Sequence, residues 1–341
     1  MGKLIHHHFI LIASVCLIPL LLLVGCSREA SRTEFLLNTV CKIRISGGDE
    51  SDLDAAFERI RQIESTMSSH ISGNEISRIG SNSVESTQLS VDTCLVIKKA
   101  LHFSLLSDGL FDITIAPVVG LWGFGTEHAQ LPTAHALNKV LPLVDYTQVR
   151  ILDNCRIVTA PEQQVDLGGI AKGYASDEAA KVLQEAGVKR ALINLGGNVF
   201  AFGKKKDGSL WKLGIQDPLR ERGSVLGTLE IGGGAVVTSG IYERYVEHNG
   251  KRYHHLLNPN TGYPFVNNVA GVSITAPSGL DADALSTAVF LLGIEKGCKL
   301  LDDFPQSGAV FITKNREITT YGIASAHFTL TNQDYKVIDR R

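Results

Sequence analysis

The sequence predicts a mixed α+β fold with largely antiparallel sheets and packed helices, in a single body with two lobes. Apolar residues recur at helical spacing mainly in the first half of the chain, whereas short strand-like runs dominate the second half. Two such runs flank Asn249-Gly250, a dipeptide that favours hairpin turns because both residues adopt positive φ. No repeat, low-complexity tract or Pro/Ser-rich linker divides the chain.

Composition excludes several classes of protein. Hydrophobic residues make up 44% and charged residues 20% of the 341-residue chain, so it can bury a sizeable core. The 33 Lys and Arg residues nearly balance the 35 Asp and Glu residues, to a net charge of −2. The chain therefore lacks the basic excess that is typical of nucleic-acid-binding proteins. The six cysteines form no CxxC pair, which disfavours a zinc ribbon. The four beyond the N-terminal segment are expected in the core, with a disulfide among them left open.

The N-terminal segment is predicted to be a lipoprotein signal peptide over 1–25, followed by one domain over 26–341. Its apolar run over 9–24, about 16 residues, is short for a membrane span. The run ends in Leu23-Val24-Gly25-Cys26, which resembles a bacterial lipobox whose cysteine receives lipid. We therefore expect lipidation at Cys26 and a lipid-anchored protein of the bacterial cell envelope, facing the periplasm or exterior, with the inner membrane favoured. An uncleaved anchor helix is the alternative.

The first half of the mature chain contains the regular helical patterns. Apolar residues three and four apart predict a helix over 52–67, capped by Ser51 or Asp52. Similar patterns predict helices over 92–107 and 173–186, ended by Gly109 and Gly187. A strand is expected over 35–46 and a glycine-rich loop over 120–125.

The second half is predicted to be mainly β. Strands are expected over 191–202, 211–216, 235–239, 243–248, 251–257, 270–276, 309–313 and 317–321. Two short helices, over 283–292 and 294–302, interrupt them. The Gly196-Gly197 pair inside the first strand marks either a bulge or a close backbone approach to a ligand.

Several common enzyme motifs are missing from the sequence. It contains no GxGxxG fingerprint, no P-loop, no HExxH and no GxSxG. A standard Rossmann enzyme, P-loop NTPase, HExxH metalloprotease or α/β-hydrolase therefore has little support.

A carboxylate and two glycines precede the helix predicted at 173. In the run from Asp166 to Gly173, Gly168 and Gly169 allow close backbone approach, and the helix N-terminus favours an anion. Lys172 adds a point charge that suits phosphate. On these residues alone, an ordinary helix start with turn glycines is the alternative.

Two further segments carry candidate site side chains. His254 and His255 are adjacent on a predicted strand, so at most one can enter a given site, and a structural histidine is the simpler alternative. Asp283 and Thr287 are four residues apart and share one face of a predicted helix, where their oxygens suit Mg²⁺. Helix capping by Asp281 or Asp283 would explain the same residues without a metal.

Taken in order, these segments resemble the FAD:protein FMN transferase family, also called ApbE, over about residues 35–322. The motifs that match are Met67-Ser68, Phe111-Asp112-Ile113-Thr114, Leu121-Trp122-Gly123-Phe124-Gly125 and the segments around Lys172, Gly196, Ser239, His255 and Thr287. So many motifs in one order are highly specific, and they imply an ApbE-like, T-fold-related body. Two positions depart from the family pattern. Leu37-Asn38 replaces a Met-Gly, and Asn258 replaces an aspartate while keeping its turn chemistry.

The resemblance implies a magnesium-dependent reaction of FAD. Members of the family cleave the FAD pyrophosphate, attach FMN through a phosphoester to a Thr or Ser of a partner protein, and release AMP. The acceptors are typically flavin-bearing subunits of membrane redox complexes. The expected cofactor is therefore Mg²⁺, with FAD as substrate. The expected partners are such an acceptor and the membrane, through the lipid anchor, with no nucleic acid.

Motif position also implies the site residues. Gly169, Asp283 and Thr287 are expected to bind Mg²⁺, the first through its backbone carbonyl. The flavin nucleotide is expected to contact Leu37, Leu110, Phe111, Asp112, Asp166, Lys172 and Leu257. His255 is the expected general base for the acceptor hydroxyl, because an imidazole with a near-neutral pKa suits that task, and Asp283 is the other expected catalytic residue.

Two other activities remain open. The same site could hydrolyse FAD to FMN and AMP with water as the acceptor. Alternatively, the protein could bind FAD without catalysis, an interpretation that the Asn258 replacement keeps open.

Overall fold

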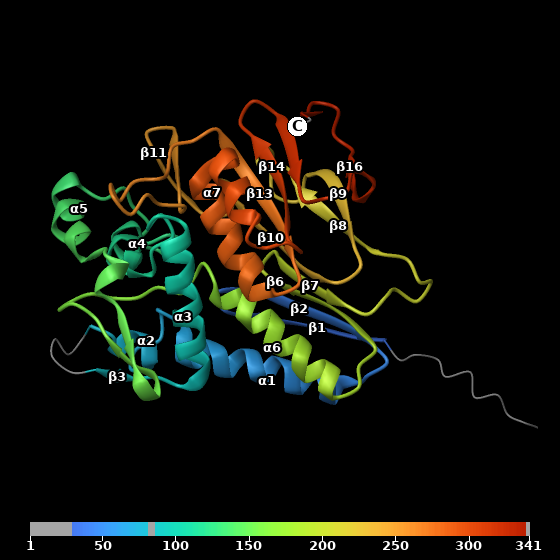
Figure 1. Ribbon diagram of the computed structural model, residues 1–341, viewed down its shortest axis with the longest axis horizontal. Helices are drawn as coiled ribbons and strands as arrows, with labels where there is room; N and C mark the ends of the chain where they lie inside the picture. Colours follow the sequence, from blue (N-terminus) through green and yellow to red (C-terminus); the bar gives the residue numbers. More distant parts are fainter. Residues whose placement is uncertain (1–28, 81–85, 339–341) are drawn as a thin grey trace, which may run out of the picture.

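A nine-stranded sheet forms the centre of the fold (Figure 1). The computed structural model describes residues 29–80 and 86–338, so the predicted signal peptide and Cys26 lie outside the described residues. In spatial order the strands are β1 (Glu29–Leu36), β2 (Thr39–Ser46), β6 (Arg190–Leu195), β7 (Asn198–Phe202), β10 (Gly234–Gly240), β13 (Val269–Ala276), β14 (Gly308–Thr313), β15 (Glu317–Tyr321) and β17 (Lys336–Val337). Each neighbouring pair is antiparallel except β15 with β17. This confirms the predicted mixed α+β class with largely antiparallel sheets.

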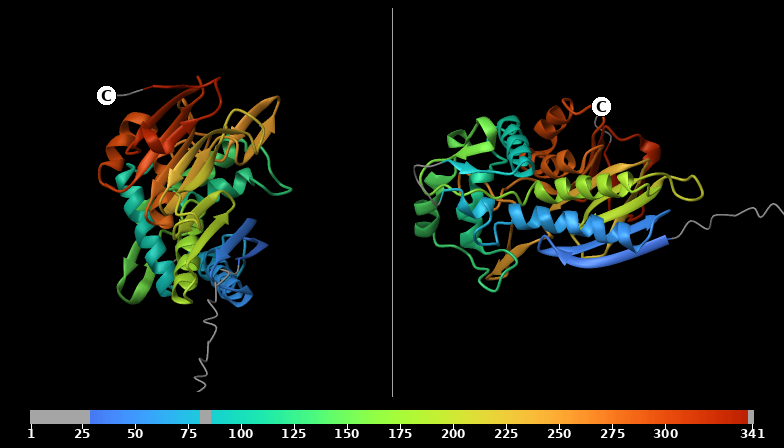
Figure 2. Two further views of the ribbon diagram at one scale, coloured as in Figure 1. Left: turned by 90° about the vertical axis from the view of Figure 1, so that its right-hand side faces the viewer. Right: turned by 90° about the horizontal axis from the view of Figure 1, so that it is seen from below.

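Three helices cover one face of this sheet (Figures 1 and 2). They are α1 (Glu50–Met67), α6 (Ala171–Glu185) and α7 (Gly279–Leu301), with α3 (Val91–Leu106) packed beside α7. Side chains such as Ile43 of β2 and Phe57 and Ile60 of α1 are fully buried between the two layers. Burying this apolar face is the main source of stability of the layered arrangement.

Smaller elements extend the fold on either side of this core. On the other face of the sheet lie β8 (Trp211–Gln216), β9 (Val225–Ile231) and β16 (Phe328–Leu330), which bury a second apolar cluster. A second lobe contains α4 (Ala116–Trp122), α5 (Ala134–Val140) and the hairpin of β11 (Tyr245–His248) and β12 (Lys251–His254), around Trp122. Near its base lie α2 (Glu75–Arg78), β3 (Thr87–Gln88), β4 (Arg150–Leu152) and β5 (Arg156–Val158). Short 3₁₀ turns are η1 (Ile113–Ile115), η2 (Leu141–Leu143), η3 (Tyr146–Gln148), η4 (Asp153–Cys155) and η5 (Ser325–His327).

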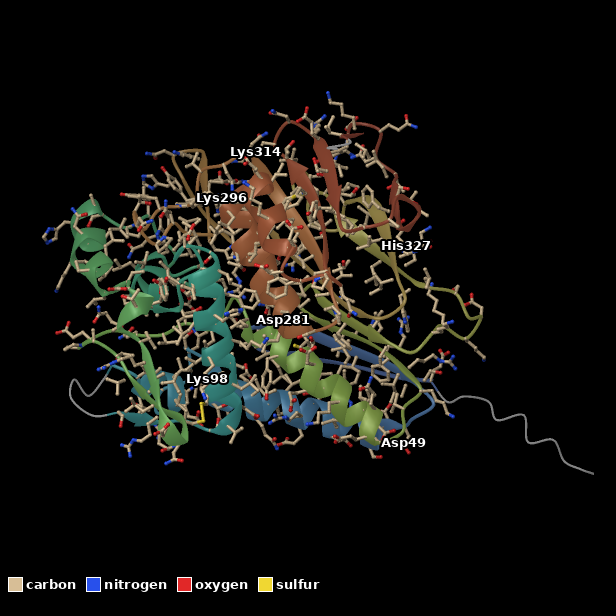
Figure 3. The ribbon with its side chains drawn as sticks, in the orientation of Figure 1. Asp49, Lys98, Asp281, Lys296, Lys314 and His327 are labelled. Atoms are coloured by element: carbon tan, nitrogen blue, oxygen red, sulfur yellow. A yellow bond between two sulfur atoms is a disulfide. The ribbon has the colours of Figure 1, made fainter. Side chains whose placement is uncertain are left out.

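A disulfide joins α3 to the small sheet. Cys94 and Cys155, 61 residues apart in sequence, are bonded with their Cα atoms 5.5 Å apart. Figure 3 shows the bond beside Lys98. Within the described part of the chain, Cys41 and Cys298 form no disulfide. The pairing settles the alternative that composition left open.

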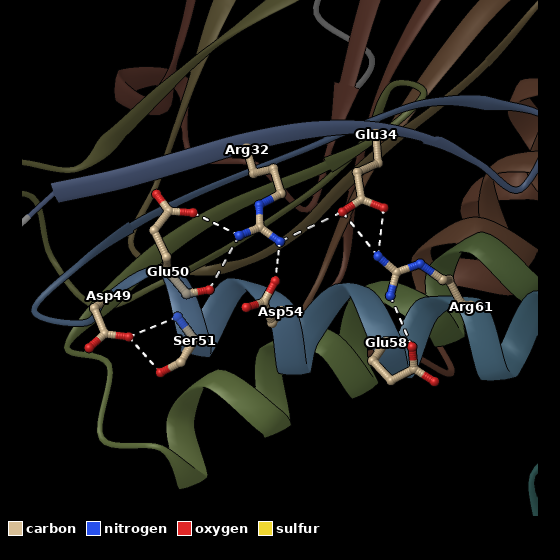
Figure 4. Close-up of polar contacts among 8 residues, drawn as sticks. All are labelled: Arg32, Glu34, Asp49, Glu50, Ser51, Asp54, Glu58 and Arg61. Carbon is tan, nitrogen blue, oxygen red and sulfur yellow. Dashed lines mark hydrogen bonds and ion pairs between the residues drawn. The ribbon is translucent and has the colours of Figure 1, made fainter.

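The helices predicted over 52–67, 92–107 and 173–186 are confirmed, but the cap predicted for the first is wrong. Asp49 is the N-cap of α1, and its carboxylate accepts a hydrogen bond from the Ser51 N–H (2.8 Å, Figure 4). Asp52 in turn accepts from the Asp49 N–H at 2.8 Å, which completes a capping box. The helix therefore begins two residues earlier than its apolar spacing indicates.

Ion pairs hold β1 against the exposed side of α1 (Figure 4). Arg32 contacts Glu50 at 2.8 Å and also pairs with Asp54, and Arg61 contacts Glu34 at 2.9 Å. Solvent screens exposed pairs of this kind, so they fix orientation more than stability.

Two predicted strands are in fact hairpins. The run over 35–46 turns at Leu37 and Asn38, whose φ angles are 53° and 54°. The run over 191–202 turns at Gly196 and Gly197, with φ angles of 65° and 103°, so the glycine pair is a tight turn and not a bulge. Positive φ at both central residues is what a two-residue hairpin of type I′ requires.

Three other predictions need adjustment. The loop expected over 120–125 starts inside α4, which ends at Trp122 with Gly123 as a left-handed cap. The two helices expected over 283–302 form one element, α7, with a kink at Gly293 where φ is 75°. The hairpin at Asn249-Gly250 is confirmed, although its strands are shorter than predicted. Among the described residues no helix is both long and apolar enough to span a bilayer.

Candidate active site

The start of α6 contacts the first turns of α7. Asp283 on α7 is buried, and its Oδ2 atom accepts a hydrogen bond from the Gly173 N–H at 2.9 Å. A Cβ atom at Gly173 would lie 2.1 Å from the carbonyl oxygen of Gly279, so only glycine allows the two helices to approach this closely. The sequence thus places a carboxylate at the positive end of the α6 dipole.

Lys172 lies beside this contact between the start of α6 and the first turns of α7, which we call the corner. Its Nζ atom donates to the Gly168 carbonyl at 2.9 Å and lies 3.7 Å from Asp283 Oδ2. The cation, the helix N-terminus and the carboxylate therefore meet within one small volume. Such a corner can hold a phosphate through Lys172 and a hard cation through Asp283.

Hydroxyl groups and a glycine backbone complete the corner. Thr287, one helical turn beyond Asp283, is the half-buried residue in an otherwise buried stretch of α7. A Cβ atom at Gly169 would lie 3.5 Å from Thr287 Oγ1 and 3.0 Å from the ring of Phe111, so this backbone is directly against both side chains. Gly169, Asp283 and Thr287, predicted together, are therefore brought together.

The donor set fits a hard cation such as Mg²⁺. It offers one carboxylate, one hydroxyl and one backbone carbonyl, which leaves further positions to water and to substrate phosphates. No group of three or more His, Cys, Asp or Glu side chains is arranged around a possible metal within 29–80 and 86–338. The predicted Mg²⁺ ligands include only one side chain of these four types, Asp283. The lack of a three-residue group therefore does not test the predicted Mg²⁺ site.

The carboxylates expected at the flavin nucleotide are already hydrogen-bonded within the protein. Asp166 Oδ1 accepts from the Gly168 N–H at 2.8 Å, and its Oδ2 accepts from the Ser69 hydroxyl at 3.2 Å. Asp112 accepts from the Thr114 and Tyr146 N–H groups at 2.8 and 3.1 Å. Burial raises the pKa of Asp112, and these hydrogen bonds oppose the rise. The Asp166 N–H also donates to the Ile113 carbonyl at 2.8 Å, so the segments after Phe111 and before α6 lie together.

The two histidines have different surroundings, but the strand predicted to carry both is shorter than expected: β12 ends at His254, and His255 lies just beyond it. His255 lies edge-on to Phe124, and its Nδ1 atom is 3.2 Å from the Arg244 carbonyl oxygen. Burial and the positive charge of Arg244 lower the pKa of His255 to about 3, and Lys172 acts in the same direction. This direction departs from the near-neutral pKa that the motif led us to expect. His254 packs instead against Phe290 of α7, and burial lowers its pKa to about 4.

Comparison with known proteins identifies the family. The ApbE family model matches residues 37–312. This chain belongs to the ApbE family. A Klebsiella pneumoniae (strain 342) protein named FAD:protein FMN transferase is 33% identical over 317 residues, which cover 92% of this chain and 98% of that protein. A Treponema pallidum protein of the same name is 35% identical over 314 residues, 85% of this chain and 86% of that protein.

Solved structures of ApbE proteins share the fold. The ApbE protein of Thermotoga maritima is 31% identical with a TM-score of 0.76, covering 84% of this chain and 95% of that chain. The flavin transferase ApbE from Vibrio cholerae is 26% identical with a TM-score of 0.76, covering 91% and 98% respectively. The family resemblance of the motifs is therefore confirmed by both sequence and structure.

Three expected nucleotide contacts of this ApbE chain have side chains in an apolar cluster or lie in a turn. The side chain of Leu257 is buried in the apolar cluster of the second lobe, beside Trp122. Leu110 packs at the edge of the main core. Leu37 occupies the β1–β2 turn, where its N–H donates to Glu64 Oε1 at 2.7 Å.

The sequence interpretation missed two hydroxyls. Ser239 at the end of β10 lies with its Oγ atom 2.8 Å from Ser286 Oγ and 3.4 Å from Thr287 Oγ1. Both serines lie in ApbE motifs, Thr-Ser-Gly and Ala-Leu-Ser-Thr, but neither motif reveals that the strand end meets the helix. Ser239 therefore orients the face of α7 that carries Thr287.

Asn258 keeps the turn that an aspartate would form. Its Oδ1 atom accepts from the Asn260 N–H at 2.9 Å, and its carbonyl accepts from the Gly262 N–H at 2.8 Å. The Gly262 carbonyl in turn accepts from the Trp122 indole at 2.7 Å. The replacement therefore preserves the local structure that presents His255.

Proposed function

We propose that this protein is a magnesium-dependent FAD:protein FMN transferase that attaches FMN through a phosphoester to a Thr or Ser of a partner protein and releases AMP. The observation that carries the proposal is the convergence of Gly169, Asp283 and Thr287 beside Lys172 and the N-terminus of α6. The names of the relatives, FAD:protein FMN transferase, support the same activity.

Some residues of this corner would bind the substrate and the metal, and others would orient them. Lys172 and the start of α6 hold the pyrophosphate, and the ring of Phe111 lies against Gly169, where the flavin end of the nucleotide would pass. Asp283, Thr287 and the Gly169 carbonyl would hold Mg²⁺, which when bound neutralises negative charge on the phosphates. Ser239 positions Thr287 through its hydroxyl contact.

His255 is proposed to take the proton of the acceptor hydroxyl. The acceptor oxygen forms a bond to the phosphorus on the FMN side, the bond from that phosphorus to AMP breaks, and the proton passes to the imidazole. The lowered pKa keeps the ring neutral and able to accept a proton at physiological pH. Nearby phosphates would raise that pKa toward the working range, because an anion favours the protonated form.

The proposed place of action is outside the cytoplasm, on a lipid anchor at Cys26, with a flavin-bearing subunit of a membrane redox complex as acceptor. The Cys94–Cys155 disulfide supports an oxidising compartment. Replacement of Cys26 by serine is expected to leave the signal peptide attached. Mature soluble protein that begins elsewhere would contradict the anchor.

The experiment that tests the activity is incubation with FAD and Mg²⁺, with and without a threonine-bearing acceptor protein. AMP that appears together with flavin on the acceptor supports transfer. AMP with free FMN, whether or not the acceptor is present, identifies a pyrophosphatase. FAD binding without AMP identifies a non-catalytic flavin-binding protein.

A further inference from the structure

A basic cavity of about 590 Å³ lies at the end of the sheet where β1 begins. The strand register places Glu29 opposite Ser46, and Ser46 opposite Arg190, so three strands present their ends in one row. The loop between β7 and β8 reaches the same end of the molecule (Figures 1 and 2). None of the predicted active-site residues lines this cavity.

Positive charge dominates the walls. Four cationic side chains line the cavity, contributed by Arg44, Arg190, Lys205 and Lys206. They face two carboxylates, those of Glu29 and Asp207. The Asp207 carboxylate is already engaged, because it accepts from the Ser209 N–H at 2.9 Å and from the Ser209 hydroxyl at 2.7 Å. The cavity therefore keeps an excess of positive charge for an anionic ligand.

A buried hydroxyl points to a ligand in the same place. Ser46 is only 6% exposed, and its Oγ atom has no hydrogen-bond partner within the described residues. Buried polar atoms are nearly always satisfied, so an orphaned hydroxyl on a cavity wall indicates a group that is bound there. Trp211 forms another part of the wall, with its indole N–H fixed to the Gly203 carbonyl at 2.6 Å.

We infer that this cavity binds the phosphate of an anionic phospholipid headgroup. Arginine, lysine and hydroxyl donors around one pocket match the oxygens of a phosphodiester. A free phosphate ion has the same chemistry, but the short segment between the predicted lipidation site and the first strand favours the lipid. Two residues lie between Cys26 and Glu29, which limits their separation to about 10 Å, so a lipid on Cys26 would hold this end at the membrane surface. This step rests on the proposed lipidation.

The inference also orients the active site. Helix α6 runs from the Asp283 corner toward the cavity end, where β6 begins at Arg190. Its 15 residues span roughly 22 Å. Lipid binding at the cavity would therefore place the corner about that far from the bilayer surface. The active site would then face acceptor domains that stand out from the membrane.

Tryptophan fluorescence of the full-length lipoprotein in a neutral detergent tests the inference. The chain has two tryptophans, and Trp122 is fully buried in the second lobe, so changes report on Trp211. The probes are micelles doped with phosphatidylglycerol, micelles doped with phosphatidylcholine, and inorganic phosphate. We expect a saturable change with phosphatidylglycerol that is much weaker with the other two probes.

Variants make the test specific. Each cation removed near an anionic surface weakens binding about fivefold, so Lys205→Gln with Lys206→Gln should weaken it about 25-fold. Ser46→Ala should weaken it further. Lys212→Gln is the matched control, because Lys212 pairs with Glu230 at 3.8 Å outside the cavity. None of these changes should alter flavin transfer to a soluble acceptor, which keeps this test separate from the proposed activity.

Three results would overturn the inference. An equal response to inorganic phosphate would mean a free-phosphate site. An equal response to both lipids would mean that charge is not recognised. Equal binding by the Lys205/Lys206 variant and the Lys212 control would show that the cavity is not where the lipid binds.

Discussion

Asp283 Oδ2 lies 2.9 Å from the backbone nitrogen of Gly173, 110 residues away in sequence, and accepts its hydrogen bond. The contact brings the only side-chain carboxylate of the proposed metal set to the positive end of α6. Capping and metal binding were competing explanations of Asp283 in the sequence. The structure shows that Ser278 is the N-cap of α7, so Asp283 does not cap its own helix, and one of its carboxylate oxygens is used in the contact with α6.

Replacing Asp283 by alanine should cut AMP release steeply and raise the Mg²⁺ concentration needed for half-maximal rate, because the anionic ligand is lost. AMP is measured across a Mg²⁺ titration. Asp281→Ala is the matched control, since Asp281 lies on the same turn but pairs with Lys99 at 3.4 Å (Figure 3 labels Asp281). An Asp283→Ala protein with unchanged rate at low Mg²⁺ would reject the metal assignment.

Replacing His255 by alanine should lower flavin transfer by about 10²–10⁴-fold while FAD affinity changes little. His254→Ala, which removes a ring packed on Phe290, should keep most of the activity. Because the base must be neutral and the pKa of His255 is lowered to about 3, kcat/KM should not fall as pH drops through 6.5. Normal transfer by His255→Ala would exclude it as the base, and loss only in His254→Ala would exchange the two roles.

Replacing Gly173 by alanine should destabilise the protein by about 1–3 kcal/mol or more, because its Cβ would lie 2.1 Å from the Gly279 carbonyl oxygen. Urea denaturation measures the change. Gly120→Ala is the control. It lies in α4 with open space around the added atom, so the change should stabilise by up to about 1 kcal/mol. Similar stabilities of the two variants would refute the close α6–α7 contact.

Removing the disulfide by Cys94→Ala and Cys155→Ala should lower the free energy of unfolding by about 4 kcal/mol, the loop-closure value for a separation of 61 residues. A reductant should lower the stability of the wild type by a similar amount and leave the double variant unchanged. If reductant has no effect on the wild type, the two cysteines are not bonded in solution.

The sequence predicts those parts of the site that depend on local spacing. Asp283 and Thr287 could be paired because four residues make about one helical turn, and Gly169 could be added through its motif. Ser239 could not be joined to them, because its contact with Ser286 depends on how β10 packs under α7. The pKa of His255 was also beyond reach, since burial and the charge of Arg244, which the hairpin brings close, set it.

In the fold, too, features set by local spacing could be predicted, whereas contacts between distant segments could not. The helix cores were predictable from apolar spacing, whereas the turn at Leu37 was not, because leucine rarely adopts positive φ. The Cys94–Cys155 pairing joins segments whose approach no local pattern indicates. The basic cavity was equally hidden, since strand register brings Ser46 beside Arg190, and Trp211 reaches them from a separate sheet.

The most direct test of the central claim is the intact mass of a threonine-bearing acceptor after incubation with this protein, FAD and Mg²⁺. The account predicts that the acceptor gains the mass of one FMN less one water, with an equal amount of AMP released. A metal chelator should abolish the gain, and so should an acceptor whose threonine is replaced by alanine. An acceptor of unchanged mass while AMP and free FMN accumulate would contradict flavin transfer.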